Sequence, residues 1–365
     1  RWKDGLVTEG DVFAERLLQV IDEGQRTATY KLALILALID ASAEHADDSG
    51  RAPDALHTRD VARHVLRLYL PQTRLYLAGD GEARILRQIT NKRSAILGAV
   101  VRLHMAADSA HCRSFAEIAA RLPDELESCL DTVETTVARY PLRLLQVVGR
   151  EHRPFLYDIE WGESVALRAL HAAGGGQVRF RPGAGDHLLR LAPLVRPLVE
   201  LHWTRMVARL NRLAVEEERL HQHLFGAERA AFPAALRAGL VDLHGSTCFY
   251  CDRPLRSRVE LDHFIPWSRW PNDAIENLVP ADRCNARKRD YLPALAHVER
   301  WADRLTHHGS DLATIGSTAS WESDAHRSLA LVRSCYAHLP AGTPLWLQGD
   351  RFTDDDPARV VGLLS

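Results

Sequence analysis

The segment Cys248–Tyr291 reads CFYCDRPLRSRVELDHFIPWSRWPNDAIENLVPADRCNARKRDY. It brings together thiols, carboxylates, a histidine that follows an aspartate, several amides and a run of arginine and lysine. Thiols and carboxylates bind metal ions, a histidine accepts protons near neutral pH, and arginine and lysine bind phosphate. No other part of the sequence combines these groups so densely. The segment therefore predicts a site for hydrolysis of a phosphodiester, and the remainder of the chain is expected to support it or direct it to a target.

Cys248 and Cys251 have the CxxC spacing of a zinc knuckle. Such a turn places two thiolates on one face, where a tetrahedral ion can bind both. Cys284 is the expected third ligand of a structural Zn²⁺ site. The fourth ligand stays open at this point, with Asp282, His244 and water as alternatives. A packed turn without metal is the competing interpretation of the same residues.

Residues 259–261 read as a β-strand that runs into Asp262 and His263. A histidine at a strand end, beside a carboxylate, is well placed to accept a proton from water, because histidine ordinarily titrates at about pH 6.5. Asp262 offers the hard oxygen ligand that Mg²⁺ prefers. A lone histidine is more often part of a protein core. The neighbouring residues favour the catalytic interpretation here.

The end of the segment supplies amides and cations. Asn277 can hold a loop by bonding backbone groups, and residues 282–290 read as the start of a helix. Asn285 can offer its side-chain oxygen to the same cation as Asp262. Lys288, with its neighbours Arg287 and Arg289, can bind phosphates. Two strands and a helix with these groups match the layout of a nuclease that uses one metal ion.

These residues resemble the HNH endonucleases, also called His-Me finger or ββα-metal nucleases. The resemblance rests on CFYC, ELDHFIPWS, ENLVP and CNARKRD in that order and covers residues 245–293. It implies a DNA-cutting enzyme with Mg²⁺ or Mn²⁺ as cofactor. The last position of the signature is Asn285 here rather than histidine. Such proteins from bacteria, with a long helical N-terminal region, are often associated with restriction of foreign DNA.

Carried over residue by residue, the resemblance assigns His263 as the general base and Asp262 and Asn285 as ligands of the catalytic metal ion. Asn277 becomes the structural amide of the signature, and Lys288 is expected near a phosphate. The catalytic set is complete.

The chain departs from the zinc-bearing members of the family in two ways. Ala281 stands where a second CxxC pair would have its first cysteine, so Cys284 is alone. The segment between Asn277 and Cys284 is also about one residue shorter. Both departures bear on the zinc site, and they make Asp282 a candidate substitute ligand.

The rest of the sequence is mostly helical in pattern. The predicted fold is mainly α with a small α+β part, in which a ββα-metal module follows a helical N-terminal region. Residues 186–224 read as one long helix, with kinks near Pro193 and Pro197, and Gly174–Gly176 reads as a turn rather than a phosphate-binding loop. The expected domains are a helical domain (1–141), a small β-containing element (142–185), a helical connector (186–244), the nuclease module (245–293) and a helical C-terminal extension (294–365).

Composition limits the remaining classes. The chain has 365 residues, a formal net charge of −2 and a hydrophobic fraction of 46%, which suits a globular protein of two or three domains. Because the total charge is near zero, contact with nucleic acid has to come from a local patch. The longest apolar run, residues 32–39, is too short for a bilayer, so we expect a cytoplasmic protein without a membrane partner. Scattered Cys112, Cys129 and Cys335 indicate buried thiols rather than disulfides.

The leading hypothesis is a metal-dependent DNA endonuclease in bacterial defence or restriction. One alternative is a nuclease subunit that stays idle until a protein partner bound through the helical N-terminal region signals. Another is a zinc-knuckle module that binds nucleic acid without catalysis, against which the set of Asp262, His263 and Asn285 argues. RNA stays open as a substrate, since a one-metal site acts on a phosphodiester rather than on the sugar.

Overall fold

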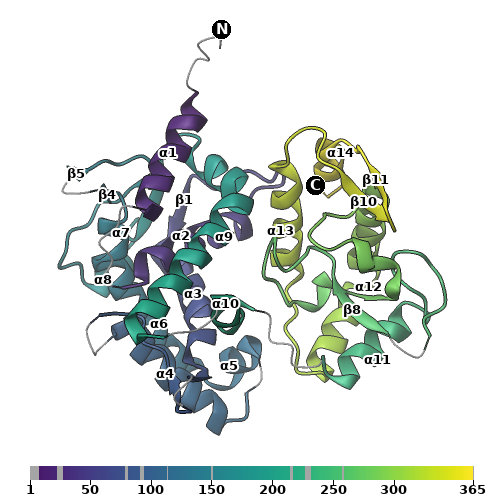
Figure 1. The fold of residues 1–365 in the computed structure, drawn as a ribbon, viewed down its shortest axis with the longest axis horizontal. Helices are drawn as coiled ribbons and strands as arrows, with labels where there is room; N and C mark the ends of the chain where they lie inside the picture. Colours follow the sequence, from purple (N-terminus) through teal and green to yellow (C-terminus); the bar gives the residue numbers. More distant parts are fainter. Residues whose placement is uncertain are drawn as a thin grey trace. The chain divides into compact units, whose positions relative to one another are not determined.

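A computed structural model describes residues 8–22, 28–78, 81–90, 94–112, 114–148, 151–213, 217–226, 232–256 and 259–364. The chain forms two compact units (Figure 1). The N-terminal unit comprises residues 1–42, 52–110 and 122–226, and the C-terminal unit comprises residues 43–51, 111–121 and 227–365. The fold class is confirmed: helices dominate, and the strands form small sheets. The division into five domains stays a prediction.

Helices make up most of the N-terminal unit. They are α1 (Glu9–Asp22), α2 (Tyr30–Glu44), α3 (Thr58–Tyr69), α4 (Ala95–Ser109), α6 (Pro123–Arg139), α7 (Pro141–Leu144), α8 (Leu167–Leu170), α9 (Ala184–Asn211) and α10 (Glu217–Phe225), with a 3₁₀ turn η1 (Pro71–Thr73). Residues 32–39, the longest apolar run, are all buried, so α2 is the central helix of this unit.

Three small antiparallel sheets complete the N-terminal unit. The first has the order β1-β7-β6, and the other two are the hairpins β2-β3 and β4-β5. Their bounds are β1 (Ala55–His57), β2 (Leu75–Leu77), β3 (Ala83–Ile85), β4 (Val147–Val148), β5 (Glu151–His152), β6 (Tyr157–Asp158) and β7 (Gln177–Phe180). The strands β4 to β7 lie within residues 142–185, and β7 pairs with β1 as well as with β6.

The single helix predicted for residues 186–224 is wrong. The helix α9 ends at Asn211, and α10 begins at Glu217. Arg212 ends α9 in the left-handed conformation, with φ 52°, which a non-glycine residue rarely adopts inside a helix. The continuous apolar pattern of the sequence does not reveal this break, because both helices bury one face in the same core. Pro193 and Pro197 do lie inside α9, as expected.

The C-terminal unit surrounds a two-stranded sheet with helices. Its elements are α5 (Phe115–Arg121), α11 (Ala234–Leu243), β8 (Glu260–His263), η2 (Ile275–Asn277), β9 (Leu278–Ala281), η3 (Arg283–Arg287), α12 (Leu295–Thr318), α13 (Ala325–Ala337), β10 (Leu345–Gln348), β11 (Arg351–Thr353) and α14 (Pro357–Leu364). The end of the C-terminal extension, which was expected to be helical, forms the β10–β11 hairpin before a final helix. The helix expected over residues 282–290 is only the 3₁₀ turn η3.

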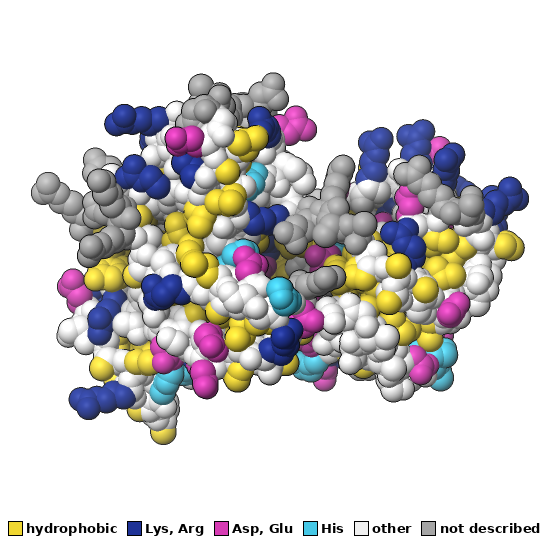
Figure 2. Space-filling view, turned by 90° about the horizontal axis from the view of Figure 1, so that it is seen from below, with side chains coloured by type: hydrophobic (Ala, Val, Ile, Leu, Met, Phe, Trp, Pro, Cys, Tyr) yellow, Lys and Arg dark blue, Asp and Glu magenta, His cyan; other side chains and the backbone are white. Residues whose placement is uncertain are grey.

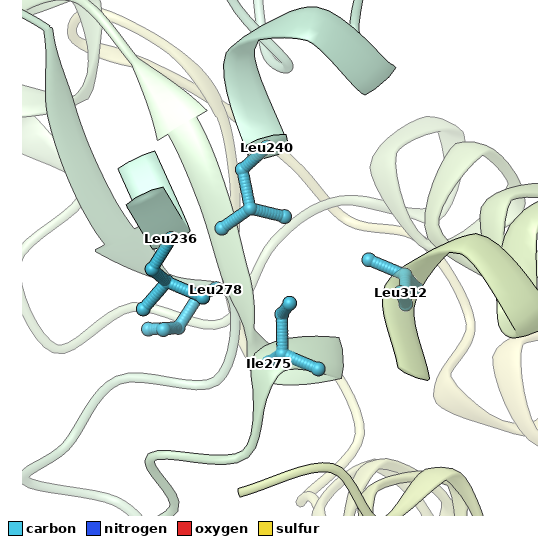
Figure 3. Close-up of a cluster of buried hydrophobic side chains, with 5 residues drawn as sticks. All are labelled: Leu236, Leu240, Ile275, Leu278 and Leu312. Atoms are coloured by element: carbon cyan, nitrogen blue, oxygen red, sulfur yellow. The ribbon is translucent and has the colours of Figure 1, made fainter. Parts of the chain in front are cut away.

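A cluster of buried aliphatic side chains lies beneath the hairpin β8–β9 (Figure 3). It consists of Leu236, Leu240, Ile275, Leu278 and Leu312, all fully buried. Figure 3 shows that they come from α11, η2, β9 and α12 and point toward one another. The cluster therefore fixes η2 and the start of β9 against two helices.

Replacement of Leu240 by alanine is expected to lower the free energy of unfolding by about 2–5 kcal/mol, because it removes buried methyl groups and leaves a cavity. Urea unfolding followed by tryptophan fluorescence measures the change. Leu363→Ala is the matched control, since Leu363 is exposed on α14 and its truncation is expected to change stability by less than about 0.5 kcal/mol. Equal effects of the two changes would contradict the assignment of this cluster as the core of the unit.

Candidate active site

The strands β8 and β9 form an antiparallel hairpin that carries the acidic and basic groups of the site. Asp262 lies opposite Val279, and His263 lies opposite Leu278. The predicted strand that runs into Asp262 and His263 is present, and it spans Glu260–His263. Because β9 is completely buried, it holds β8 against the core, and the ends of both strands are rigidly placed.

Asn277 fixes the chain where β8 ends. Its side-chain oxygen accepts a hydrogen bond from the backbone N–H of Ile265 (2.8 Å), and its amide nitrogen donates to the carbonyls of Asn272 (2.8 Å) and Ile265 (3.2 Å). The side chain is buried. The uncharged amide both donates and accepts, so it can bond to both segments at once. These bonds agree with the loop-holding action expected of Asn277.

Two buried side chains of α12 also hold the segment around Asn277. The indole of Trp301 stacks on Phe264 with ring centroids 5.3 Å apart and donates to the carbonyl of Glu276 (2.7 Å). Arg304 is buried and donates to the carbonyls of Leu278 (2.8 Å) and Glu276. Burial lowers the pKa of Arg304 to about 10. Both side chains project from α12, so this helix positions η2 and its Asn277.

His263 is oriented by a carboxylate that the sequence analysis did not single out. Its Nε2 lies 2.7 Å from Oδ1 of Asp273. This bond places the ring proton on Nε2 and leaves Nδ1 as the proton acceptor. The imidazole is 17% exposed and lies between Trp267 and Phe232, with ring centroids 5.4 and 6.1 Å away. Trp321 donates to the carbonyl of Asp273 (2.6 Å) and so fixes the carboxylate-bearing residue.

Asp262 is the centre of a second group of contacts. Its Oδ2 accepts hydrogen bonds from the hydroxyl of Tyr250 (2.6 Å) and from Nζ of Lys288 (2.8 Å). Lys288 also donates to the carbonyl of His263. Burial raises the pKa of Tyr250, so the phenol is a firm donor. Both bonds end on Oδ2, and none within the described ranges ends on Oδ1.

Lys288 differs from the sequence-based expectation. Its side chain is only 2% exposed, and its ammonium faces Asp262 rather than solvent. Burial lowers the pKa of Lys288, and the adjacent carboxylate of Asp262 counters that effect. A residue so enclosed binds within the protein and does not reach a phosphate from the surface. The reason is local: η3 is a short 3₁₀ turn, which directs position 288 inward while Arg287 and Arg289 are exposed.

The three expected thiols converge with one carboxylate. The ligand atoms of Cys248, Cys251, Asp282 and Cys284 all lie within 4.8 Å of one another. Sγ of Cys248 is 3.4 Å from Sγ of Cys284, and Sγ of Cys251 is 4.0 Å from Oδ1 of Asp282. The nearby thiol of Cys284 lowers the pKa of Cys248 to about 5 and has its own pKa raised in return. A lowered pKa favours the thiolate, which is the form of cysteine that binds a metal ion.

Of the three candidates for a fourth ligand, the structure brings Asp282 to the thiols. His244 instead packs its ring against Phe249 (5.6 Å between centroids) and lies 3.4 Å from Arg304. Burial lowers the pKa of His244 to about 3, so this imidazole stays neutral. Asp282 caps η3 by accepting from the backbone N–H of Cys284 (2.6 Å), which holds its carboxylate beside the thiols.

None of the six cysteines, all of which lie in the described ranges, forms a disulfide, and three of them belong to this cluster. Cys129 is buried, whereas Cys112 and Cys335 are half-buried rather than buried, which corrects the expectation for those two.

The donor sets fit two different kinds of metal ion. Three sulfurs and one carboxylate oxygen within 4.8 Å suit a tetrahedral soft-to-borderline ion such as Zn²⁺. Asp262 and the half-buried Asn285 offer oxygens only, which suits a hard divalent cation that keeps most of its water ligands. The cluster of thiols can therefore hold a structural ion, and the carboxylate of Asp262 is suited to a catalytic one.

Two parts of the chain match known protein families. Residues 248–294 match the HNH endonuclease family, which confirms the resemblance seen in the sequence. Residues 11–224, more than half of the chain, match the family described as Domain of unknown function (DUF8808), and the chain belongs to this family. No curated protein matches the chain, and no solved structure does. None of the described helices is long and apolar enough to cross a membrane.

Proposed function

We propose that the protein is a metal-dependent endonuclease that hydrolyses phosphodiester bonds in DNA and serves in bacterial defence or restriction. The observation that carries the proposal is the hydrogen-bonded pair of His263 and Asp273. His263 is the last residue of β8, and Asp262 precedes it in the same strand. An imidazole with a carboxylate on one ring nitrogen and no proton on the other has the arrangement of a general base. The match to HNH endonucleases supports nucleic acid as the substrate class.

In this mechanism, Nδ1 of His263 accepts the proton of the attacking water. Asp273 holds the ring in the tautomer that leaves Nδ1 free and stabilises the imidazolium as it forms. Asp262 and Asn285 would hold the catalytic cation, which supplies stabilisation for the charge that develops on the phosphate and the leaving oxygen. Lys288 and Tyr250 keep the carboxylate of Asp262 in place. Exposed Arg287 and Arg289 are available to phosphates.

The second candidate is a nuclease subunit gated by a protein partner. The size of the N-terminal unit favours it, since that unit has a core of its own and lies outside the match to HNH endonucleases. A binding module without catalysis is disfavoured by the His263–Asp273 pair, because a clamp for nucleic acid does not require an oriented base.

The substrate is tested with end-labelled DNA and RNA of the same sequence, each single-stranded and double-stranded, in the presence of Mg²⁺ or Mn²⁺. We expect cleavage of DNA that depends on the added metal ion. Cleavage confined to RNA would refute the DNA assignment and leave the hydrolytic site standing. Cleavage that begins only when a cell extract is added would favour the partner-gated subunit.

Asp273 gives the mechanism a specific prediction. Asp273→Asn is expected to reduce cleavage by about 10²-fold or more, because an amide can donate to Nε2 and shift the ring proton onto Nδ1. Asp273→Ala, which imposes no tautomer, is expected to be the more active of the two. Single-turnover rates across a range of pH give the comparison. A merely structural aspartate predicts the reverse order, since asparagine preserves its shape, and that order would contradict the assignment.

A further inference from the structure

Exposed arginines gather around the thiol cluster from both segments that form it. Arg253 and Arg256 follow Cys251, whereas Arg283, Arg287 and Arg289 surround Cys284, and all five side chains are exposed. We call these five residues the arginine rim. Figure 2 shows Lys and Arg side chains gathered along one edge of the C-terminal unit, at the right of the view.

The backbone joins the two halves of the rim firmly. The N–H of Cys248 donates to the carbonyl of Arg253 (2.9 Å), and an isolated bridge pairs Thr247 with Pro254. On the other side, Asp282 accepts from the N–H of Cys284. Because Cys248 and Cys284 meet at 3.4 Å, the segments that carry the arginines are held next to each other.

Two of the nearby carboxylates have partners outside the rim. Asp252 pairs with Arg300 (2.9 Å), and Asp290 accepts from the hydroxyl of Ser268. Asp350 lies 3.4 Å from Arg287, in an exposed pair that contributes little. Glu260 is exposed on β8.

For the other four arginines of the rim, the described part of the chain shows no ion pair. These are Arg253, Arg256, Arg283 and Arg289. Exposed guanidinium groups without a paired carboxylate attract a polyanion. Guanidinium also binds phosphate oxygens in a bidentate manner, which favours a phosphate backbone over a single anion.

We propose that the arginine rim binds the phosphate backbone of duplex DNA and so holds the duplex beside His263. This inference rests on the proposed function, whose substrate it makes more specific. Guanidinium groups bind phosphate oxygens, and contacts to the phosphate backbone are independent of base sequence. Choice of a target, where there is one, then has to come from outside the rim.

The test uses the full chain carrying His263→Ala, so that the duplex stays intact in Mg²⁺. Binding of a fluorescent duplex of about 30 base pairs is measured by anisotropy at several salt concentrations. The test variant adds Arg253→Gln and Arg256→Gln. The control adds Arg51→Gln and Arg359→Gln, which remove the same charge from exposed positions of the same unit. Metal content per chain is measured for every variant, so that loss of the thiol cluster is recognised.

We expect the Arg253/Arg256 variant to bind more weakly on any duplex sequence, and the slope of log K against log salt to decrease in magnitude by about 1 for each arginine removed. The control is expected to keep the parent slope. Equal slopes in the two variants would overturn the inference, and so would a parent chain that binds duplex DNA without salt dependence. If the parent chain with His263 cleaves DNA in either of those cases, the proposed function stands, and only the role of the arginine rim is rejected.

Discussion

His263→Ala is expected to reduce DNA cleavage by about 10²–10⁴-fold, the contribution that a positioned general base makes. The reason is geometric: Nε2 is held by Asp273 at 2.7 Å, so Nδ1 is the atom left to accept the proton from water. Alanine removes the acceptor without disturbing the fold, because the ring is flanked by Trp267 and Phe232 rather than enclosed by the core cluster. Single-turnover cleavage of a labelled duplex measures the loss.

The control for this change is His307→Ala, since His307 is an exposed histidine on α12 within the same unit. It is expected to cleave at the parent rate. Circular dichroism and duplex binding should agree between the two variants. Cleavage by His263→Ala at the parent rate, in protein free of contaminating nuclease, would exclude His263 as the base.

Cys284→Ser is expected to abolish tight metal binding at the thiol cluster and to destabilise the C-terminal unit by several kcal/mol. Apparent binding free energies of structural Zn²⁺ are about 10–16 kcal/mol, and in small domains this energy is used for folding. Here Cys284 joins η3 to the turn of Cys248 and Cys251, so its loss separates the two segments. Metal analysis and thermal unfolding measure both effects.

Cys335→Ser is the matched control, because Cys335 is a half-buried thiol of α13 outside the cluster. It is expected to retain the metal ion and nearly the parent melting temperature. A parent chain purified without any bound metal, and unfolding at the same temperature with and without added Zn²⁺, would contradict the metal assignment. In that case the cluster is the packed turn that was the alternative from the sequence.

The chemistry of the segment was predictable from sequence because it depends on order and spacing. The CxxC turn, the strand that ends at His263 and the loop around Asn277 are local features, and each occurs where expected. Asp273 was missed for the opposite reason. It lies in an irregular loop, ten residues after His263, and only the folded path of that loop brings the two side chains together.

The direction in which the Lys288 side chain points could not be predicted from the sequence either. A basic residue at the end of a presumed helix suggests an exposed face, but a 3₁₀ turn rotates side chains differently from an α-helix. Position 288 therefore points inward to Asp262. Likewise, Asp282 and His244 were equivalent candidates in the sequence, and only the packing of His244 against Phe249 separates them. Such choices depend on tertiary contacts that a periodic pattern does not carry.

The decisive experiment is conversion of supercoiled plasmid by the purified chain, with and without Mg²⁺ or Mn²⁺, beside His263→Ala. We expect nicked or linear plasmid with the parent chain in the presence of the metal ion, and neither product without the metal ion or with the variant. Folded, metal-loaded parent chain that leaves the plasmid supercoiled would contradict a free-standing DNA endonuclease. Cleavage that is the same in the parent and in His263→Ala would contradict the site itself.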